Sequence, residues 1–222
     1  TPLQKQNPET TIIDIPLDIV YVQDETGSMG NDIAALVSLA PEIWDGIDSI
    51  TTNEFKMSVV GYRDYARYPW GSSGDHVYRL LGDFTSSRGQ FVNAVNQLTA
   101  SGGGDNPEAP YAAISYLLTP SHPCIDSNGN GNCADGHDTP YGHQPTFRSG
   151  ATRIILLATD AGAHEPADTT GYPGPGYFEV IESLTNNRTV VIGLVPGGSG
   201  AVSDIDVLAE ATGGSVHSTG AT

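Results

Sequence analysis

The chain has 222 residues, of which 38% are apolar and 16% are charged. This composition is too apolar for a disordered chain, and the length suits one α/β domain with a sizeable core. Acidic residues outnumber basic ones by 26 to 9, and the net charge of −17 repels nucleic acid and anionic membranes but attracts cations. The same acidity could simply keep an extracellular protein soluble.

Apolar runs alternate with segments of helical periodicity along the chain. Strands are expected at 15–23, 55–62, 77–84, 153–158, 189–195 and 215–218. Helices are expected at 32–48, 87–98, 108–118, 177–184 and 202–211. This alternation predicts an α/β fold with a doubly wound, mostly parallel sheet flanked by helices and one antiparallel edge strand near 77–84. We expect a single domain over residues 1–222, with a surface insertion at 120–150 and no membrane-spanning segment.

Three acidic loops are expected to meet at one edge of this sheet. Two buried strands run into Asp24 and Asp160, and a glycine-rich loop before a helix carries Asp105 and Glu108. The carboxyl ends of parallel strands share an edge, where open α/β sheets form their sites. Carboxylates this close repel one another unless a cation lies between them, so the arrangement predicts a metal site.

The first of these loops has the pattern D-x-T-x-S, formed by Asp24, Thr26 and Ser28. One carboxylate and two hydroxyls can converge on a hard ion such as Mg2+, Mn2+ or Ca2+. Because the hydroxyls are neutral, the ion keeps an affinity for one more anionic oxygen from outside. Singly, the aspartates could instead cap helices, and Asp64 could pair with a nearby arginine.

The three motifs in this order resemble the metal-ion-dependent adhesion site of von Willebrand factor A domains. The segments 104–108 (Gly-Asp-Asn-Pro-Glu) and 158–164 (Ala-Thr-Asp-Ala-Gly-Ala-His) resemble more particularly the I-like domain of integrin β subunits. The resemblance spans residues 15–218. It implies a central Mg2+ or Mn2+ site with these ligands, some of them through water: Asp24, Thr26, Ser28, Glu108 and Asp160.

The resemblance also implies two flanking Ca2+ sites. One would use Asp64, Asp105, the carbonyl of Pro107 and Glu108, although Gly103 stands where integrins have a contributing asparagine. A weaker one would use Ser28, Asn31 and Asp32, where Asn31 replaces an aspartate of the integrin pattern. His164 is expected on the rim, without a ligand role.

The insertion at 120–150 contains a possible calcium loop of its own. Its start, D-x-N-x-N-G, resembles an EF-hand loop and offers oxygens from Asp126, Asn128 and Asn130, with Asp135 as a substitute for the missing glutamate. A solvated Asn/Gly turn is the alternative. Cys124 and Cys133 flank this loop, and a disulfide is favoured over a zinc site that would include His137.

These features favour a metal-dependent adhesion module rather than an enzyme. Its partner would be a protein or peptide whose exposed Asp or Glu completes the coordination of the central ion. The resemblance implies an extracellular or cell-surface location within a larger protein. Two alternatives stay open: a metal-dependent hydrolase, for which Glu108 is the candidate general base, and a domain whose ions are only structural. Dinucleotide, P-loop and nucleophile-elbow motifs are absent.

Overall fold

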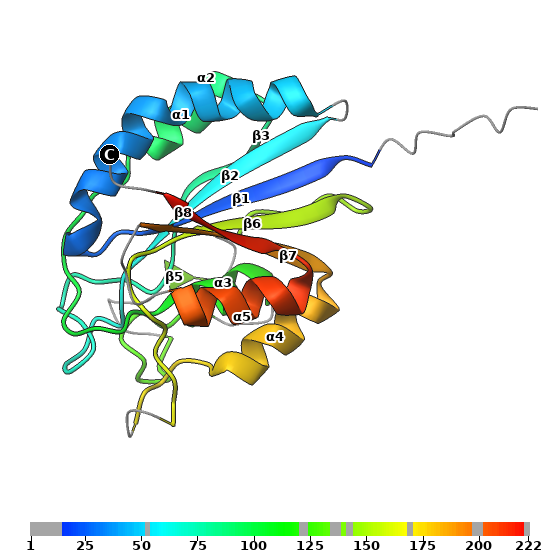
Figure 1. Ribbon diagram of the computed structural model, residues 1–222. Coiled ribbons are helices and arrows are strands. Elements are labelled where there is room, and N and C mark those ends of the chain that lie inside the picture. Colours follow the sequence, from blue (N-terminus) through cyan, green and yellow to red (C-terminus); the bar gives the residue numbers. More distant parts are fainter. Residues whose placement is uncertain are drawn as a thin grey trace, which may run out of the picture.

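The computed structural model describes residues 15–51, 54–119, 124–133, 139–140, 144–167, 171–196 and 202–219. Its main feature is a six-stranded sheet in the order β3-β2-β1-β6-β7-β8 (Figure 1). These strands are β1 (Leu17–Asp24), β2 (Phe55–Tyr62), β3 (Arg79–Thr85), β6 (Thr152–Ala158), β7 (Thr189–Pro196) and β8 (Ser215–Thr219). The helices are α1 (Gly30–Ile50), α2 (Arg88–Val95), α3 (Pro110–Leu118), α4 (Tyr177–Asn186) and α5 (Val202–Thr212), and a short 3-10 helix η1 (Gly27–Met29) precedes α1.

The sheet is parallel except at one edge, where β3 runs antiparallel to β2. Helices α1 and α2 cover one face, and α3, α4 and α5 cover the other (Figure 1). The predicted fold class, including the antiparallel edge strand, is confirmed. Among the described residues, no helix is long and apolar enough to cross a membrane.

Strand β1 is buried on both sides because it lies in the middle of the sheet. Its side chains alternate between the two faces, as the twofold period of a strand requires. Ile19 and Tyr21 belong to the core beneath α1 and α2, whereas Val20 and Val22 belong to the core beneath α3, α4 and α5. This two-sided burial explains the nearly continuous apolar run in the sequence.

Helix α1 packs on the sheet through an apolar stripe with helical spacing, formed by Ile33, Leu36, Ala40 and Trp44. The ring of Trp44 lies 4.7 Å from that of Phe55 on β2, measured between centroids. The packing anchors α1, and with it the preceding loop at the end of β1.

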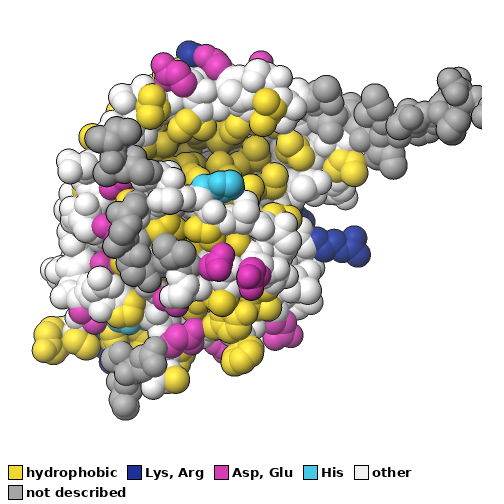
Figure 2. Space-filling model, in the orientation of Figure 1, with side chains coloured by type: hydrophobic (Ala, Val, Ile, Leu, Met, Phe, Trp, Pro, Cys, Tyr) yellow, Lys and Arg dark blue, Asp and Glu magenta, His cyan; other side chains and the backbone are white. Residues whose placement is uncertain are grey.

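The sheet face beside α1 is less completely covered toward β7 and β8. Figure 2 shows apolar side chains gathered there, below α1. They surround a cavity of about 250 Å3 lined by residues of α1, β1, β6, β7 and β8, among them Tyr21, Leu36, Leu156 and Leu194.

The strand order reverses at β1, which is what places a site at its carboxyl end. From β1 the chain goes through α1 to β2 on one side, and β6 later pairs with β1 on the other side. The loops that leave β1 and β6 therefore diverge and open a crevice between them. Gln23 pairs with Ala158, so the two strands end at the same level.

The predicted insertion lies between α3 and β6 and is described only in part. It contains the two-residue strands β4 (Cys124–Ile125) and β5 (Thr139–Pro140), which pair antiparallel. A disulfide joins Cys124 to Cys133, with their Cα atoms 5.5 Å apart. Asp135 and His137, two residues considered for metal binding, lie outside the described residues.

Candidate metal centre

Asp24 ends β1 fully buried, and its carboxylate organises the loop that follows. Its Oδ1 accepts hydrogen bonds from the backbone N–H of Thr26 at 2.8 Å and from the Thr26 hydroxyl at 2.7 Å. Its Oδ2 accepts a hydrogen bond from the hydroxyl of Thr159 at 2.7 Å. Thr159 comes directly after β6, so this contact ties the ends of the two strands together.

Ser28 and Asp160 meet beside this carboxylate. The Ser28 hydroxyl donates a hydrogen bond to Asp160 Oδ1 at 3.0 Å, across 132 residues of sequence. It also lies 3.3 Å from the Thr26 hydroxyl. Oxygen atoms of Asp24, Thr26, Ser28 and Asp160 thus form a connected chain at the edge of the sheet.

The glycine-rich loop brings Glu108 to the same place. The N–H of Gly27 donates to the carbonyl of Gly102 at 3.3 Å, and the N–H of Glu108 donates to the carbonyl of Gly162 at 3.0 Å. Gly103 has a φ of +77°, and a Cβ there would lie 3.0 Å from Glu108 Oε1 and 3.3 Å from Thr26 Cβ. Glycine therefore allows the loop to approach both side chains.

Glu108 was expected in the first turn of a helix, but α3 begins only at Pro110. The reason is that the backbone of Glu108 forms a parallel bridge with Ala163, in the loop after β6. This bridge is a contact between distant segments, so helical periodicity could not reveal it.

The five residues of the predicted central site border one cleft or support its floor. The cleft has a volume of about 310 Å3, and its walls come from the three acidic loops. Its lining includes Thr26, Ser28, Asp105, Glu108 and Asp160, while Asp24 lies buried behind Thr26. Ser28 is exposed, so the cleft is open to a partner.

The carboxylates of this site are destabilised in the absence of a cation. Burial raises the pKa of Asp24 to about 6, with hydrogen bonds from Thr26 and Thr159 opposing this shift and the charge of Asp160 adding to it. Burial, reinforced by the charge of Asp24 and other carboxylates, raises the pKa of Glu108 to about 10.

In addition, Glu108 Oε2 is buried and has no hydrogen-bond partner in the part of the chain that the structure describes. A divalent cation would relieve both the charge repulsion and the missing contact. The residues present therefore fit the ion that the sequence led us to expect, with an all-oxygen donor set.

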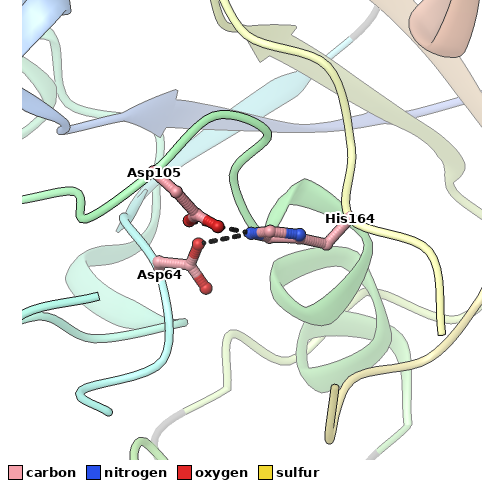
Figure 3. A group of neighbouring side chains, drawn as sticks. All are labelled: Asp64, Asp105 and His164. Carbon is pink, nitrogen blue, oxygen red and sulfur yellow. Dashed lines mark hydrogen bonds and ion pairs between the residues drawn. The ribbon is translucent and has the colours of Figure 1, made fainter. Parts of the chain in front are cut away.

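At the first predicted flanking site, the expected position of one residue is wrong. His164 was expected on the rim, yet its side chain is only 1% exposed and its Nε2 points at two of the predicted ligands (Figure 3). Its Nε2 is 2.9 Å from Asp64 Oδ2 and 3.3 Å from Asp105 Oδ1. Asp64 thus pairs with His164 and not with a neighbouring arginine.

The titration of this group follows from burial and close contact. Burial raises the pKa of Asp64 and of Asp105. Burial would lower the pKa of His164, but its hydrogen bond to Asp64 and the charges of both aspartates raise it overall. The carbonyl of Pro107 and the side chain of Glu108, the other two predicted ligands, follow Asp105 by two and three residues in the same loop.

The other predicted ligand sets are less assembled. Ser28 lines the cleft, whereas Asp32 lines the apolar cavity beside α1, so the weaker flanking site stays a prediction. In the insertion, the Asp126 carboxylate accepts hydrogen bonds from the N–H groups of Asn130, at 3.2 Å, and Gly131, at 2.7 Å. Asn128 Oδ1 also accepts from Asn130 N–H, at 3.0 Å. The loop is compact, and calcium binding there stays a prediction.

Buried charged residues support the first acidic loop, and the sequence analysis did not identify them. Glu25, next to Asp24, is fully buried and contacts His76, Arg79 and the N–H of Thr99. Arg63 donates to the carbonyl of Glu25 at 3.2 Å. The only signal in the sequence is a Glu at the second position of the D-x-T-x-S motif, which does not identify its partners.

Comparisons with known proteins agree with this fold. Residues 18–127 match the von Willebrand factor A domain family. An ariadne-like RING finger protein of Acanthamoeba polyphaga mimivirus is 33% identical over 102 residues, which cover 46% of this chain and 9% of that protein. Integrin beta-PS of Drosophila melanogaster is 24% identical over 166 residues, which cover 69% of this chain and 17% of that protein.

A solved structure has the same fold. Proximal thread matrix protein 1 from the mussel byssus, determined with a zinc-occupied MIDAS motif, matches with a TM-score of 0.59 and 11% identity. The match covers 94% of this chain and 44% of that one, so this chain spans less than half of each of these relatives. The sequence match, the fold and the arrangement of the acidic loops together identify this chain as a von Willebrand factor A-like domain.

Proposed function

We propose that this chain is a metal-dependent binding module that captures an acidic side chain of a protein partner. The observation that carries the proposal is the convergence of Asp24, Thr26, Ser28, Glu108 and Asp160 at an open cleft. Further support comes from the mussel byssus protein of the same fold, whose MIDAS motif holds zinc.

The donor set suits Mg2+ or Mn2+, because all donors are carboxylate or hydroxyl oxygens. When bound, such an ion supplies a positively charged coordination position that an external carboxylate can occupy. Asp24 holds Thr26 in place through two hydrogen bonds, and Ser28 faces the open cleft. Neutral hydroxyls lower the total ligand charge, so a partner's Asp or Glu adds favourable electrostatic energy.

An exposed aromatic side chain supports recognition of a protein. Tyr68 is 89% exposed in the loop that follows β2, and an exposed aromatic side chain supplies contact area at interfaces. The net charge of −17 fits a partner whose surface is basic around its acidic contact residue. We further propose an extracellular location within a larger protein, and Ca2+ in the loop that begins at Asp126.

The test is NMR titration of the labelled chain with two pentapeptides that differ only in a central Asp or Asn. With saturating Mg2+, the Asp peptide should shift the amide resonances of Gly27, Ser28 and Gly103. The Asn peptide, and the Asp peptide with EDTA, should leave them unchanged.

Equal shifts with both peptides, or shifts that survive EDTA, would overturn the proposal. If Mg2+ raises the melting temperature but neither peptide shifts these resonances, the ions are only structural. Cleavage of either peptide would identify a hydrolase.

A further inference from the structure

The segment 159–164, which follows β6, contributes to the cleft in two ways. Asp160 is one of the predicted ligands and lines the cleft itself. Further along the segment, the backbone holds Glu108 from both sides. The N–H of Glu108 donates to the carbonyl of Gly162 at 3.0 Å, and the N–H of His164 donates to the carbonyl of Glu108 at 2.9 Å. The path of this segment therefore sets the positions of two carboxylates at once.

A side chain from α5 holds this segment in place. Asp204, in the first turn of α5, accepts a hydrogen bond through its Oδ2 from the backbone N–H of Ala163 at 2.8 Å. Ala163 is buried, and it is the residue that forms the parallel bridge with Glu108. The Asp204 carboxylate is therefore bonded directly to the piece of backbone that positions Glu108.

Gly162 leaves the space that this carboxylate occupies. A Cβ on Gly162 would lie 2.7 Å from Asp204 Oδ2 and 3.9 Å from the Cβ of Pro107. The φ of Gly162 is outside the left-handed region, so alanine suits the backbone at this position. A methyl group there would therefore act mainly on Asp204, by pushing its carboxylate away from Ala163.

Helix α5 gives Asp204 a rigid base. The next residue, Ile205, is fully buried, and so is Leu208, one turn later. On β7, a Cβ at Gly193 would collide with Ile205 Cγ2, so the helix and the strand approach each other closely. The helix lies on the face of the sheet opposite α1 (Figure 1). The side chain that holds segment 159–164 is thus fixed to the core on that face.

We propose that Asp204 is a positioning residue of the cleft, which holds segment 159–164 where Asp160 and Glu108 can bind an ion, and that it couples ion binding to α5. Asp204 is not among the described residues that line the cleft, and it acts through the backbone of Ala163. The proposal rests on the proposed function for the ion itself. Because coupling is reciprocal, a bond to α5 that favours ion binding also makes α5 respond to the ion.

The first experiment measures the Mg2+ affinity of the whole chain by calorimetry. Asp204→Ala removes the acceptor and should weaken binding about 10-fold, the lower end of the range for residues that orient metal ligands. Asp204→Asn keeps an oxygen acceptor but loses the charge, and it should bind Mg2+ within about twofold of the unchanged chain. Asp206→Ala, which removes an exposed carboxylate from the same helix, is the matched control and should also stay within about twofold.

A pair of variants tests the contact itself. Gly162→Ala places a methyl group against the Asp204 carboxylate and should weaken Mg2+ binding about 10-fold, as Asp204→Ala does. Because both changes break the same bond, the double variant should bind within about twofold of either single variant. Independent effects would instead multiply to a loss of about 100-fold. Circular dichroism checks each variant, and Gly162→Ala carries the test if Asp204→Ala unfolds.

NMR reports the positioning without reference to affinity. In EDTA, Asp204→Ala should speed hydrogen exchange at the amides of Ala163 and Glu108 at least about 10-fold relative to amides of β1, whereas Asp204→Asn should not. General destabilisation would speed exchange in β1 as well. In the unchanged chain Mg2+ should shift the amide resonance of Ile205. Asp204→Ala should lose this shift and keep the shift of Gly27.

The proposal is overturned if Asp204→Ala binds Mg2+ as tightly as the unchanged chain. It is also overturned if Asp204→Asn is as weak as Asp204→Ala, since the charge alone would then matter, or if the losses multiply in the double variant.

Failure of the proposed function gives a different result. If the unchanged chain binds Mg2+ but no acidic peptide, the capture of a partner is contradicted and the role of Asp204 stands on the affinities. If the unchanged chain takes up no Mg2+, the proposed function fails, and the role of Asp204 is decided by hydrogen exchange. Unchanged exchange of Ala163 and Glu108 in Asp204→Ala would then overturn it, and faster exchange would support it.

Discussion

Replacing Glu108 with glutamine should stabilise the metal-free protein and weaken its metal binding. In the metal-free fold the pKa of Glu108 is about 10, against 4.5 for an unperturbed glutamate, because the carboxylate is buried among other carboxylates. At pH 7 the folded state therefore keeps this proton, whereas the unfolded chain releases it. Ionisation of Glu108 in the unfolded chain then favours unfolding. The 2.5 pH units between 4.5 and 7 correspond to about 3 kcal/mol.

The sign of the pH dependence is also determined. Between the two pKa values, the folded state binds more protons than the unfolded state. The contribution of Glu108 to the free energy of unfolding is therefore complete below pH 4.5 and falls as pH rises toward 10. Glutamine cannot ionise, so this contribution disappears. The advantage of Glu108→Gln should be about 3 kcal/mol at pH 7 and below about 1 kcal/mol at pH 5.

The assay is urea unfolding in EDTA at both pH values, with Glu182→Gln as the control. Glu182 is exposed, and its replacement should change stability by less than about 0.5 kcal/mol. Addition of Mg2+ should stabilise the unchanged protein much more than Glu108→Gln, because the variant lacks the negative charge that the ion offsets. The reasoning would be refuted if Glu108→Gln were no more stable than the unchanged chain at pH 7. It would also be refuted if the gain in stability at pH 5 were as large as the gain at pH 7.

Three further predictions concern the cleft and the core. Ser28→Ala should change the free energy of unfolding in EDTA by less than about 0.5 kcal/mol, because Ser28 is exposed. The same change should lower Mg2+ affinity, measured by calorimetry, at least about 10-fold. An unchanged affinity would exclude Ser28 as a ligand. Mg2+ affinity should fall with decreasing pH because Glu108 must lose its proton, and it should fall more steeply below pH 6, where protons also compete for Asp24. A slope that does not change between pH 7 and 5 would contradict the role of Asp24. Trp44→Ala should lower the unfolding free energy by about 3–5 kcal/mol, because the indole packs on Phe55, and an unchanged urea midpoint would show that α1 is not anchored there.

The fold could be predicted from sequence because its main signals are local. Strand β1 is an apolar run bounded by a polar motif, and α1 carries Ile33, Leu36, Ala40 and Trp44 at helical spacing. The order of strands and helices then leaves few topologies for a parallel sheet. The expected meeting of Asp24 and Asp160 follows from that topology, since both come after neighbouring strands.

The parts that could not be predicted depend on contacts between distant segments. His164 is buried, and its Nε2 pairs with the carboxylates of Asp64 and Asp105, which lie 100 and 59 positions away in the sequence. A lone histidine in a loop offers no signal of such partners, so the rim was the ordinary expectation. The position of Glu108 before α3 depends on its bridge to Ala163, which is equally invisible to helical periodicity.

The central claim is that a divalent ion binds where the three acidic loops meet. Anomalous diffraction from crystals of the chain grown with Mn2+ tests it directly, because the signal locates the ion without assumptions about its ligands. The account predicts a peak within coordination distance of Ser28 Oγ and of carboxylate oxygens of the cleft, and a weaker peak in Ser28→Ala crystals grown at a manganese concentration below saturation. Manganese found only at other positions, or no bound manganese at saturating concentration, would contradict it.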